Sequence, residues 1–172
     1  MLILFCGLPG SGKTVLSKKL ANKINSIYLN TDIVRKRLFE TPAYTNEEKD
    51  KIYSRMLDMA DFALKQGKDV VLDGTFYKDS LRKSAVSIAK NNSEKYLIIE
   101  CIAHEKTVKV WMQKRAKKKS VSDADFAIYE RLKKEYYPIK EKHFIFKTDK
   151  TFSTQFNKLL AEIKKLKTKK NN

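Results

Sequence analysis

A glycine-rich loop that directly follows an apolar run is the strongest constraint on this chain. Residues 7–14 read Gly-Leu-Pro-Gly-Ser-Gly-Lys-Thr and match the pattern G-x-x-x-x-G-K-[ST]. Residues 1–6 are continuously apolar, which predicts a strand buried on both faces. Leu16, Leu20 and Ile24 recur at every fourth position and predict a helix behind the loop. A strand, a loop and a helix in this order are the context in which the pattern binds phosphate.

The residue types of the loop indicate how it would bind phosphate. Its glycines let the backbone curl, so that successive amides point inward toward phosphate oxygens. The helix that begins near Lys13 adds the positive end of its dipole. We expect Lys13 to reach the β- and γ-phosphates and the Thr14 hydroxyl to bind Mg²⁺. The expected phosphate-binding residues are therefore Gly7, Gly10, Ser11, Gly12, Lys13 and Thr14.

Strand and helix patterns alternate along the rest of the chain. Short apolar runs predict further strands at Ile27–Leu29, Val70–Leu72, Tyr96–Ile102 and Phe144–Phe146. Helical spacing predicts helices at about 13–25, 32–39, 46–67, 80–89, 105–117, 124–136 and 156–166, with a capping box at 45–48 and a cap at Asp79 or Ser80. The alternation predicts a three-layer α/β/α fold around a five-stranded parallel sheet.

The length of 172 residues and the lack of a linker predict one domain over residues 1–167. Within it, residues at about 105–137 are expected to form a helical lid, and residues 168–172 a basic, disordered tail. No run is long and apolar enough to span a membrane, and the apolar N-terminus lacks the basic segment of a secretory signal. Cys6 and Cys101 lie in apolar runs, which favours buried, reduced thiols and a cytoplasmic protein.

Acidic residues follow two of the predicted strands. Asp73 ends the run Val70–Leu72, and we expect it to hold Mg²⁺ through water. Asp32 follows the second strand and is expected to accept the proton of an attacking hydroxyl; capping the next helix is its alternative role. Arg35 lies one helical turn further and would hold an anionic group of the acceptor. The roles of Asp73 and Asp32 are expected because ligands of parallel sheets bind at the carboxyl ends of the strands.

Positive charge concentrates in the second part of the chain. Residues 104–172 contain 20 Lys and Arg against 8 Asp and Glu, whereas residues 1–103 contain 17 against 12. Residues 114–119 alone hold five basic side chains, and Arg115 is the candidate to stabilise a transferring phosphoryl group. The excess predicts RNA or DNA as a partner, with solvated surface lysines as the alternative.

Aromatic residues offer weaker indications. Phe126, Tyr129, Tyr136 and Tyr137 alternate with charges and could stack on bases, although the packed side of a helix is the favoured interpretation. Trp111 is expected to lie opposite the basic stripe of its helix and to belong to the core.

These residues resemble the small P-loop kinases that include the polynucleotide 5′-kinase domain, seryl-tRNA kinase and the zeta toxins. The similarity covers roughly residues 1–165 and rests on residues 7–14, 30–35, 70–75, 115 and 121–129. It implies a P-loop NTPase fold with strand order 2-3-1-4-5, and ATP and Mg²⁺ as cofactors. The site residues that it implies are Lys13 and Thr14 for the triphosphate and Mg²⁺, Asp32 as acceptor-activating aspartate, Arg35 as acceptor-phosphate arginine, Arg115 as lid arginine and a turn at 122–124.

The acceptor is the less determined half of the mechanism, because Phe76 follows Thr75 where the polynucleotide and seryl-tRNA kinases tend to have asparagine. A kinase acting on a nucleic-acid 5′-hydroxyl is the favoured hypothesis. A small-molecule kinase for a nucleoside, sugar, antibiotic or amino-acid derivative is the alternative. The third hypothesis is an ATP-dependent binding switch in which Asp32 only caps its helix.

Overall fold

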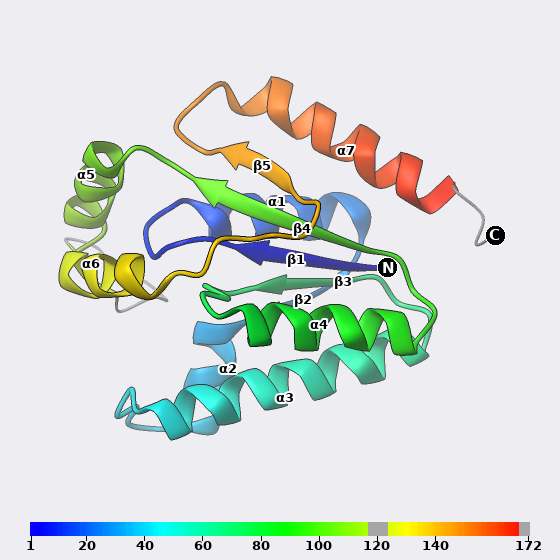
Figure 1. Ribbon diagram of the computed structural model, residues 1–172, viewed down its shortest axis with the longest axis horizontal. Helices are drawn as coiled ribbons and strands as arrows, with labels where there is room; N and C mark the ends of the chain where they lie inside the picture. Colours follow the sequence, from blue (N-terminus) through cyan, green and yellow to red (C-terminus); the bar gives the residue numbers. More distant parts are fainter. Residues whose placement is uncertain (117–123, 169–172) are drawn as a thin grey trace.

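The computed structural model describes residues 1–116 and 124–168. Its sheet is parallel and has the strand order β2-β3-β1-β4-β5 (Figure 1), which confirms the predicted order. The strands are β1 (Leu2–Cys6), β2 (Ile27–Asn30), β3 (Val70–Asp73), β4 (Tyr96–Ile102) and β5 (Phe144–Lys147). Since β1 lies between β3 and β4, its carboxyl end opens into the middle of the binding edge.

Helices cover both faces of the sheet. One face packs against α1 (Lys13–Ile24) and α7 (Phe152–Thr168). The other packs against α2 (Thr31–Leu38), α3 (Asn46–Lys65) and α4 (Asp79–Asn91). Two further helices, α5 (Glu105–Ala116) and α6 (Phe126–Glu135), lie at the end toward which β1 and β4 point (Figure 1). The predicted three-layer α/β/α fold is confirmed.

Strand β1 shows why the sequence folds this way. Every residue of β1 is buried. Leu2, Leu4 and Cys6 pack on the side of α3 and α4, whereas Ile3 and Phe5 pack on the side of α1 and α7. A continuous apolar run is required because successive side chains of a strand point to opposite faces and both faces are covered.

Both cysteines are buried and free. Burial is the main cause that raises the pKa of the Cys6 and Cys101 thiols. Buried thiols of raised pKa are poor nucleophiles, so these side chains act as small core residues.

The capping box at the start of α3 forms in a modified way. The Thr45 hydroxyl accepts a hydrogen bond from the Glu48 amide at 3.2 Å, as predicted. The Glu48 carboxylate does not return to Thr45; it accepts from the amides of Ala43 and Tyr44 at 2.8 and 2.7 Å. Glu48 therefore fixes the loop before α3.

Two predicted boundaries were wrong. Helix α4 has Lys78 at its N-cap without a side-chain cap, so neither Asp79 nor Ser80 caps it. Asp79 lies in the first turn and pairs with Lys83 at 2.6 Å, which suits a carboxylate near the positive end of the helix dipole. The tail was predicted from 168, but Thr168 belongs to α7. Residues 169–172, and residues 122 and 123 of the turn expected at 122–124, lie outside the described residues.

A separate small core joins α5 and α6 to the glycine-rich loop. Val108 and Met112 of α5 pack with Tyr129 of α6, and Leu8 of the loop packs against this cluster. Tyr129 and Phe126 stack on each other with ring centroids 5.2 Å apart. Both rings therefore serve packing, as favoured from the sequence, and this packing holds the helix pair beside the loop.

Candidate functional site: a cavity over the glycine-rich loop

The loop between β1 and α1 depends on glycine at three positions. Gly10 and Gly12 have φ angles of 75° and 81°, in the left-handed region that other residues rarely adopt. A Cβ atom at Gly10 would lie 2.8 Å from Met112, and one at Gly7 would lie 2.5 Å from the Cys101 carbonyl oxygen. Strand β4 and helix α5 thus approach the loop backbone as closely as glycine allows.

The N-terminus of α1 is open toward the cavity. Gly12 is its N-cap and offers no side-chain hydrogen bond to the first amides of the helix. The Lys13 ammonium group donates to the Leu8 carbonyl at 3.3 Å, which places it across the loop. Uncapped amides at a helix start, together with a lysine, are suited to bind a phosphate group.

The loop that follows β5 braces the glycine-rich loop. Thr148 donates its hydroxyl proton to the Ser11 carbonyl at 2.6 Å or to the Ile102 carbonyl at 3.1 Å. The Ser11 side chain is buried, and within residues 1–116 and 124–168 its hydroxyl has no hydrogen-bond partner. No pattern in the sequence indicated Thr148, because its role depends on a contact between residues 137 positions apart.

Asp73 lies at the end of β3, fully buried. One of its carboxylate oxygens accepts hydrogen bonds from the Tyr28 hydroxyl at 2.5 Å and from the Asn30 amide at 2.8 Å. Burial and the neighbouring Asp73 carboxylate raise the pKa of Tyr28, so Tyr28 remains a donor. The other oxygen, Oδ1, is buried and has no partner among the described residues.

The unpaired Oδ1 atom of Asp73 indicates whether this site suits Mg²⁺. A buried carboxylate oxygen without a donor is costly unless a cation or a cation-bound water satisfies it. Thr14 lines the cavity, and Asp73 itself does not. The two residues would suit a Mg²⁺ that the Thr14 hydroxyl holds directly and Asp73 holds through water.

Asp32 lies in the first turn of α2 and lines the cavity. The N-cap of α2 is Asn30, whose side-chain oxygen accepts from the amides of Asp32 and Ile33 at 3.0 and 3.1 Å. The alternative role of Asp32 as the helix cap is therefore wrong. Asn30 caps the helix instead, and its side-chain amide group donates to Asp73 at the same time.

Arg115, in the last turn of α5, also lines the cavity. Its guanidinium group donates to the Ala124 carbonyl just before α6, so it ties the two helices together at their junction. Lys114 is exposed. Lys117, Lys118 and Lys119 of the predicted basic run lie outside the described residues.

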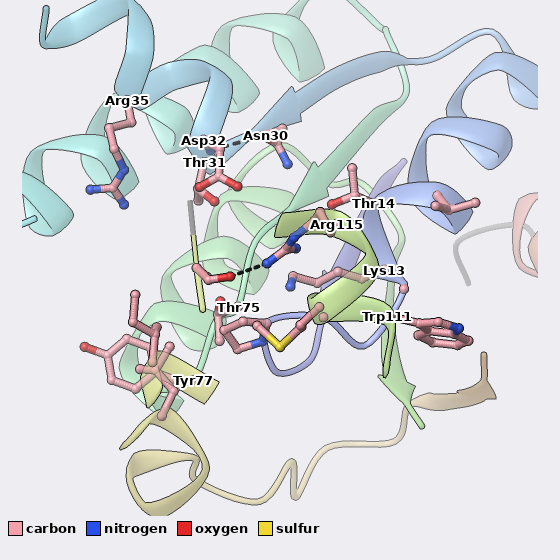
Figure 2. Close-up of a pocket in the computed structure, with 18 of the residues that line it drawn as sticks. Lys13, Thr14, Asn30, Thr31, Asp32, Arg35, Thr75, Tyr77, Trp111 and Arg115 are labelled. Atoms are coloured by element: carbon pink, nitrogen blue, oxygen red, sulfur yellow. Dashed lines mark hydrogen bonds between the residues drawn. The ribbon is translucent and has the colours of Figure 1, made fainter. Parts of the chain in front are cut away.

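These residues line one cavity of about 650 Å³. Figure 2 shows Lys13, Thr14 and Asp32 around it together with Arg115. The structure brings the predicted residues Gly10, Gly12, Lys13, Thr14, Asp32, Arg35 and Arg115 to this cavity, and leaves Gly7, Ser11 and Asp73 outside its wall.

Several cavity residues were missed by sequence reasoning. Trp111 was predicted in the core, but it is half-buried and lines the cavity. Its spacing of four from Arg115 was a usable signal, because residues i and i+4 share a helix face. Other missed residues of the cavity wall include Lys18, Tyr44, Lys49, Tyr53, Tyr77, Arg131, Thr148 and Phe152.

Among the described residues, no helix combines the length and apolar character needed to cross a membrane. The same residues contain no cluster of three or more His, Cys, Asp or Glu side chains suited to a metal ion. A Mg²⁺ at Thr14 would thus depend on phosphate and water oxygens for most of its ligands.

Comparison with known proteins gives a family match. The model of the AAA domain family matches residues 2–139, most of the chain. A protein named L-seryl-tRNA(Sec) kinase from Methanococcus maripaludis is 33% identical over 104 residues, 58% of this chain and 40% of the relative. An uncharacterised protein of Mycobacterium tuberculosis is 27% identical over 114 residues, 59% of this chain and 23% of the relative. The chain thus spans less than half the length of these curated relatives.

Solved structures share the fold at low identity. Kti12 of Chaetomium thermophilum, in complex with ADP-AlF3, has a TM-score of 0.74 and 20% identity, with 96% of this chain and 98% of that chain covered. A putative kinase of Chloroflexus aurantiacus has a TM-score of 0.72 and 18% identity, with 96% and 97% covered. The APS kinase of Mycobacterium tuberculosis, in complex with AMPPNP and APS, has a TM-score of 0.68 and 15% identity, with 95% and 96% covered. With its phosphate loop, strand order and family match, the chain belongs to the AAA domain family and has the fold of the small P-loop kinases.

Proposed function

We propose that this protein is a Mg·ATP-dependent kinase that transfers the γ-phosphate to a hydroxyl acceptor. One observation supports this most strongly: the phosphate loop and the Asp32 carboxylate line the same cavity. The cavity therefore has a nucleotide half, formed by the phosphate loop, and an acceptor half, on the side of Asp32. A protein that only binds or hydrolyses ATP does not need the acceptor half. The P-loop kinase fold adds support, and we propose one domain that extends through α7 to Thr168.

The nucleotide is bound by the loop and α1. Backbone amides and Lys13 bind the β- and γ-phosphates, and the Thr14 hydroxyl and Asp73 would hold Mg²⁺. When bound, the ion neutralises negative charge on the phosphate oxygens. The chain's own contribution is to fix the γ-phosphate opposite Asp32.

The acceptor reacts on the other side of the γ-phosphate. Asp32 accepts the proton of the acceptor hydroxyl while the hydroxyl oxygen bonds to the γ-phosphorus. The bond from that phosphorus to the bridging oxygen of ADP breaks, and ADP leaves. Arg115 stabilises the negative charge that spreads over the transferring group. We propose α5 and α6 as the lid that carries Arg115 and excludes water.

A nucleic-acid 5′-hydroxyl is the proposed acceptor. The net charge of +12 over residues 104–172 suits a polyanion. Arg35 lines the cavity near Asp32 on α2, where it could hold a phosphate of the acceptor. The relative named L-seryl-tRNA(Sec) kinase supports an acceptor attached to RNA. We further propose a cytoplasmic location, because both thiols are free.

A small-molecule kinase is the second candidate. The cavity of about 650 Å³ is within the range of small-ligand sites. Structures titled as a sugar kinase and a gluconokinase share the fold. An ATP-dependent binding switch has less support, because Asp32 does not cap its helix.

The test is transfer of label from γ-labelled ATP in Mg²⁺, with and without short 5′-hydroxyl RNA and DNA. Label on the oligonucleotide that disappears in Asp32→Ala would support the nucleic-acid kinase. ATP binding without labelled oligonucleotide, but with a labelled sugar or nucleoside, would support the second candidate. ATP binding without any labelled acceptor would contradict both.

A further inference from the structure

The acceptor side of the cavity carries three cations from three different helices. Arg35 comes from α2, Lys49 from α3 and Arg131 from α6. Only Arg35 was expected from the sequence. Lys49 and Arg131 have no part in the nucleotide half, so their presence in the same wall calls for a separate explanation.

Arg35 presents unsatisfied donors. Its side chain is 12% exposed, and its Nε and Nη1 atoms are buried without a hydrogen-bond partner in the described part of the chain. The guanidinium group lies 4.7 Å from the centre of the Tyr44 ring, which holds it in place. Glu48 is 3.9 Å from Nη1, but its two oxygens already accept from the amides of Ala43 and Tyr44. Buried guanidinium donors of this kind are costly until an anion binds them.

Lys49 and Arg131 repel each other across the same space. Burial is the main cause that lowers the pKa of Lys49, and the Arg131 charge is the next. Arg35 and Lys78 lower it further, whereas Glu135 of α6 raises it. Asp32, Glu48 and Glu135 are thus the carboxylates near the cluster, and against Arg35, Lys49, Lys78 and Arg131 they leave one positive charge in excess. An anion in the cavity would relieve this repulsion.

We propose that Lys49 and Arg131, together with Arg35, form a subsite for a phosphate group of the acceptor, and that an occupied subsite draws α6 onto α2 and α3. A tetrahedral phosphate offers several oxygens to cations that approach from different helices, and an arginine fork matches two of them. The inference rests on the proposed kinase function, because it identifies the acceptor as a hydroxyl compound that already carries phosphate.

Movement of α6 would change the position of Arg115, which lies beside the γ-phosphate site. Arg115 donates to the Ala124 carbonyl at the junction of α5 and α6. Val108 and Met112 of α5 pack against Tyr129 of α6, so the two helices share a core. A phosphate that fixes Arg131 therefore also fixes Arg115 over the γ-phosphate, and transfer would be fast only when a phosphate-bearing acceptor is bound.

The first test measures the subsite without chemistry. The protein, loaded with Mg²⁺ and AMPPNP, is titrated with inorganic phosphate in a calorimeter. Lys49→Met and Arg131→Met should each weaken phosphate binding about tenfold, because each removes one charge-assisted contact. Lys51→Met and Lys134→Met remove charges that lie outside the cavity wall on the same two helices, and should leave phosphate binding unchanged. Equal phosphate binding in all four variants and the wild type would overturn the proposal.

The second test follows the helix. Trp111 is the only tryptophan, and it lies on α5 in the cavity wall, so its fluorescence reports on that helix. Phosphate should change the Trp111 signal of the AMPPNP-loaded wild type and should do so much less in Arg131→Met. An unchanged wild-type signal at saturating phosphate would overturn the coupling to α6.

The third test identifies the source of the phosphate. The KM is compared for a 5′-hydroxyl oligonucleotide, for glycerol phosphate and for glucose, with Lys49→Met and Arg131→Met beside the wild type. The variants should raise the KM of a phosphate-bearing acceptor about tenfold and leave AMPPNP affinity unchanged. Preference for glucose in every variant would overturn the subsite, although the kinase would stand. Normal phosphate binding without any labelled acceptor would instead count against the kinase function.

Discussion

The two halves of the cavity are built in different ways. The nucleotide half comes mainly from one continuous segment, residues 7–14, and consists largely of backbone. The acceptor half is assembled from side chains of α2, α3 and α6, which are up to about 100 residues apart in the chain. A backbone site needs glycines in fixed order and leaves a motif, whereas a side-chain site leaves none. The comparison explains why the nucleotide could be inferred from the sequence and the acceptor could not.

Lys13→Ala tests the nucleotide half and should have the largest effect. Removal of the ammonium group across the loop should lower phosphoryl transfer about a thousandfold, because no other lysine of the loop can replace its charge. Single-turnover transfer from γ-labelled ATP measures this. Lys23→Ala is the control on α1, because Lys23 is exposed and lies outside the cavity wall. An equal loss in both variants would show that general positive charge is what matters.

Asp32→Ala tests the acceptor half. Transfer should fall about a hundredfold or more while ATP affinity stays nearly the same, because Asp32 acts on the acceptor proton. The cap of α2 is provided by Asn30 and survives the substitution. Asp32→Asn keeps the size and removes the charge, and should behave alike. Loss of ATP affinity together with transfer would mean that the two halves are not separate.

Gly10→Ala compares two glycines of similar backbone conformation. Gly10 and Gly67 have φ angles of 75° and 70°, but a Cβ at Gly10 would meet Met112 and Val108, whereas one at Gly67 meets nothing within 4 Å. Both substitutions should cost about 1 kcal/mol of strain. Only Gly10→Ala should weaken AMPPNP binding, by about tenfold, since it pushes α5 from the loop. Equal affinities in the two variants would contradict the close fit of α5.

Asn30→Ala tests the link between the halves. Asn30 caps α2 and also donates to Asp73, so the substitution should lower the free energy of unfolding by about 2 kcal/mol. Thr45→Ala removes only a helix cap, that of α3, and should cost about 1 kcal/mol. Urea denaturation measures both. Equal losses would show that the bond from Asn30 to Asp73 contributes little.

The fold was largely predictable. Apolar runs and helical spacing located every strand and helix in the described ranges, because burial of both sheet faces imposes strong patterns on the sequence. The errors were local. Asp79 and Asp32 are residues that often cap helices, yet Lys78 and Asn30 occupy the cap positions. Cap identity depends on the backbone angle at which each strand or loop enters the helix.

The site was predictable in part. Lys13 and Thr14 follow from the motif, and Asp32 and Asp73 follow from the ends of strands. Trp111 was misplaced because the face that its helix buries was chosen incorrectly. For Thr148, Lys49 and Arg131 no local pattern exists.

By itself, the sequence determined the phosphate loop, the parallel sheet and the carboxylates at its edge. These features depend on backbone conformation and on the alternation of buried positions, both of which are local. Only the tertiary structure decided that Asn30 joins the α2 cap to Asp73, that Thr148 braces the loop and that three helices bring cations to one wall. Such contacts depend on distances between segments far apart in the chain, which are fixed only when the core packs.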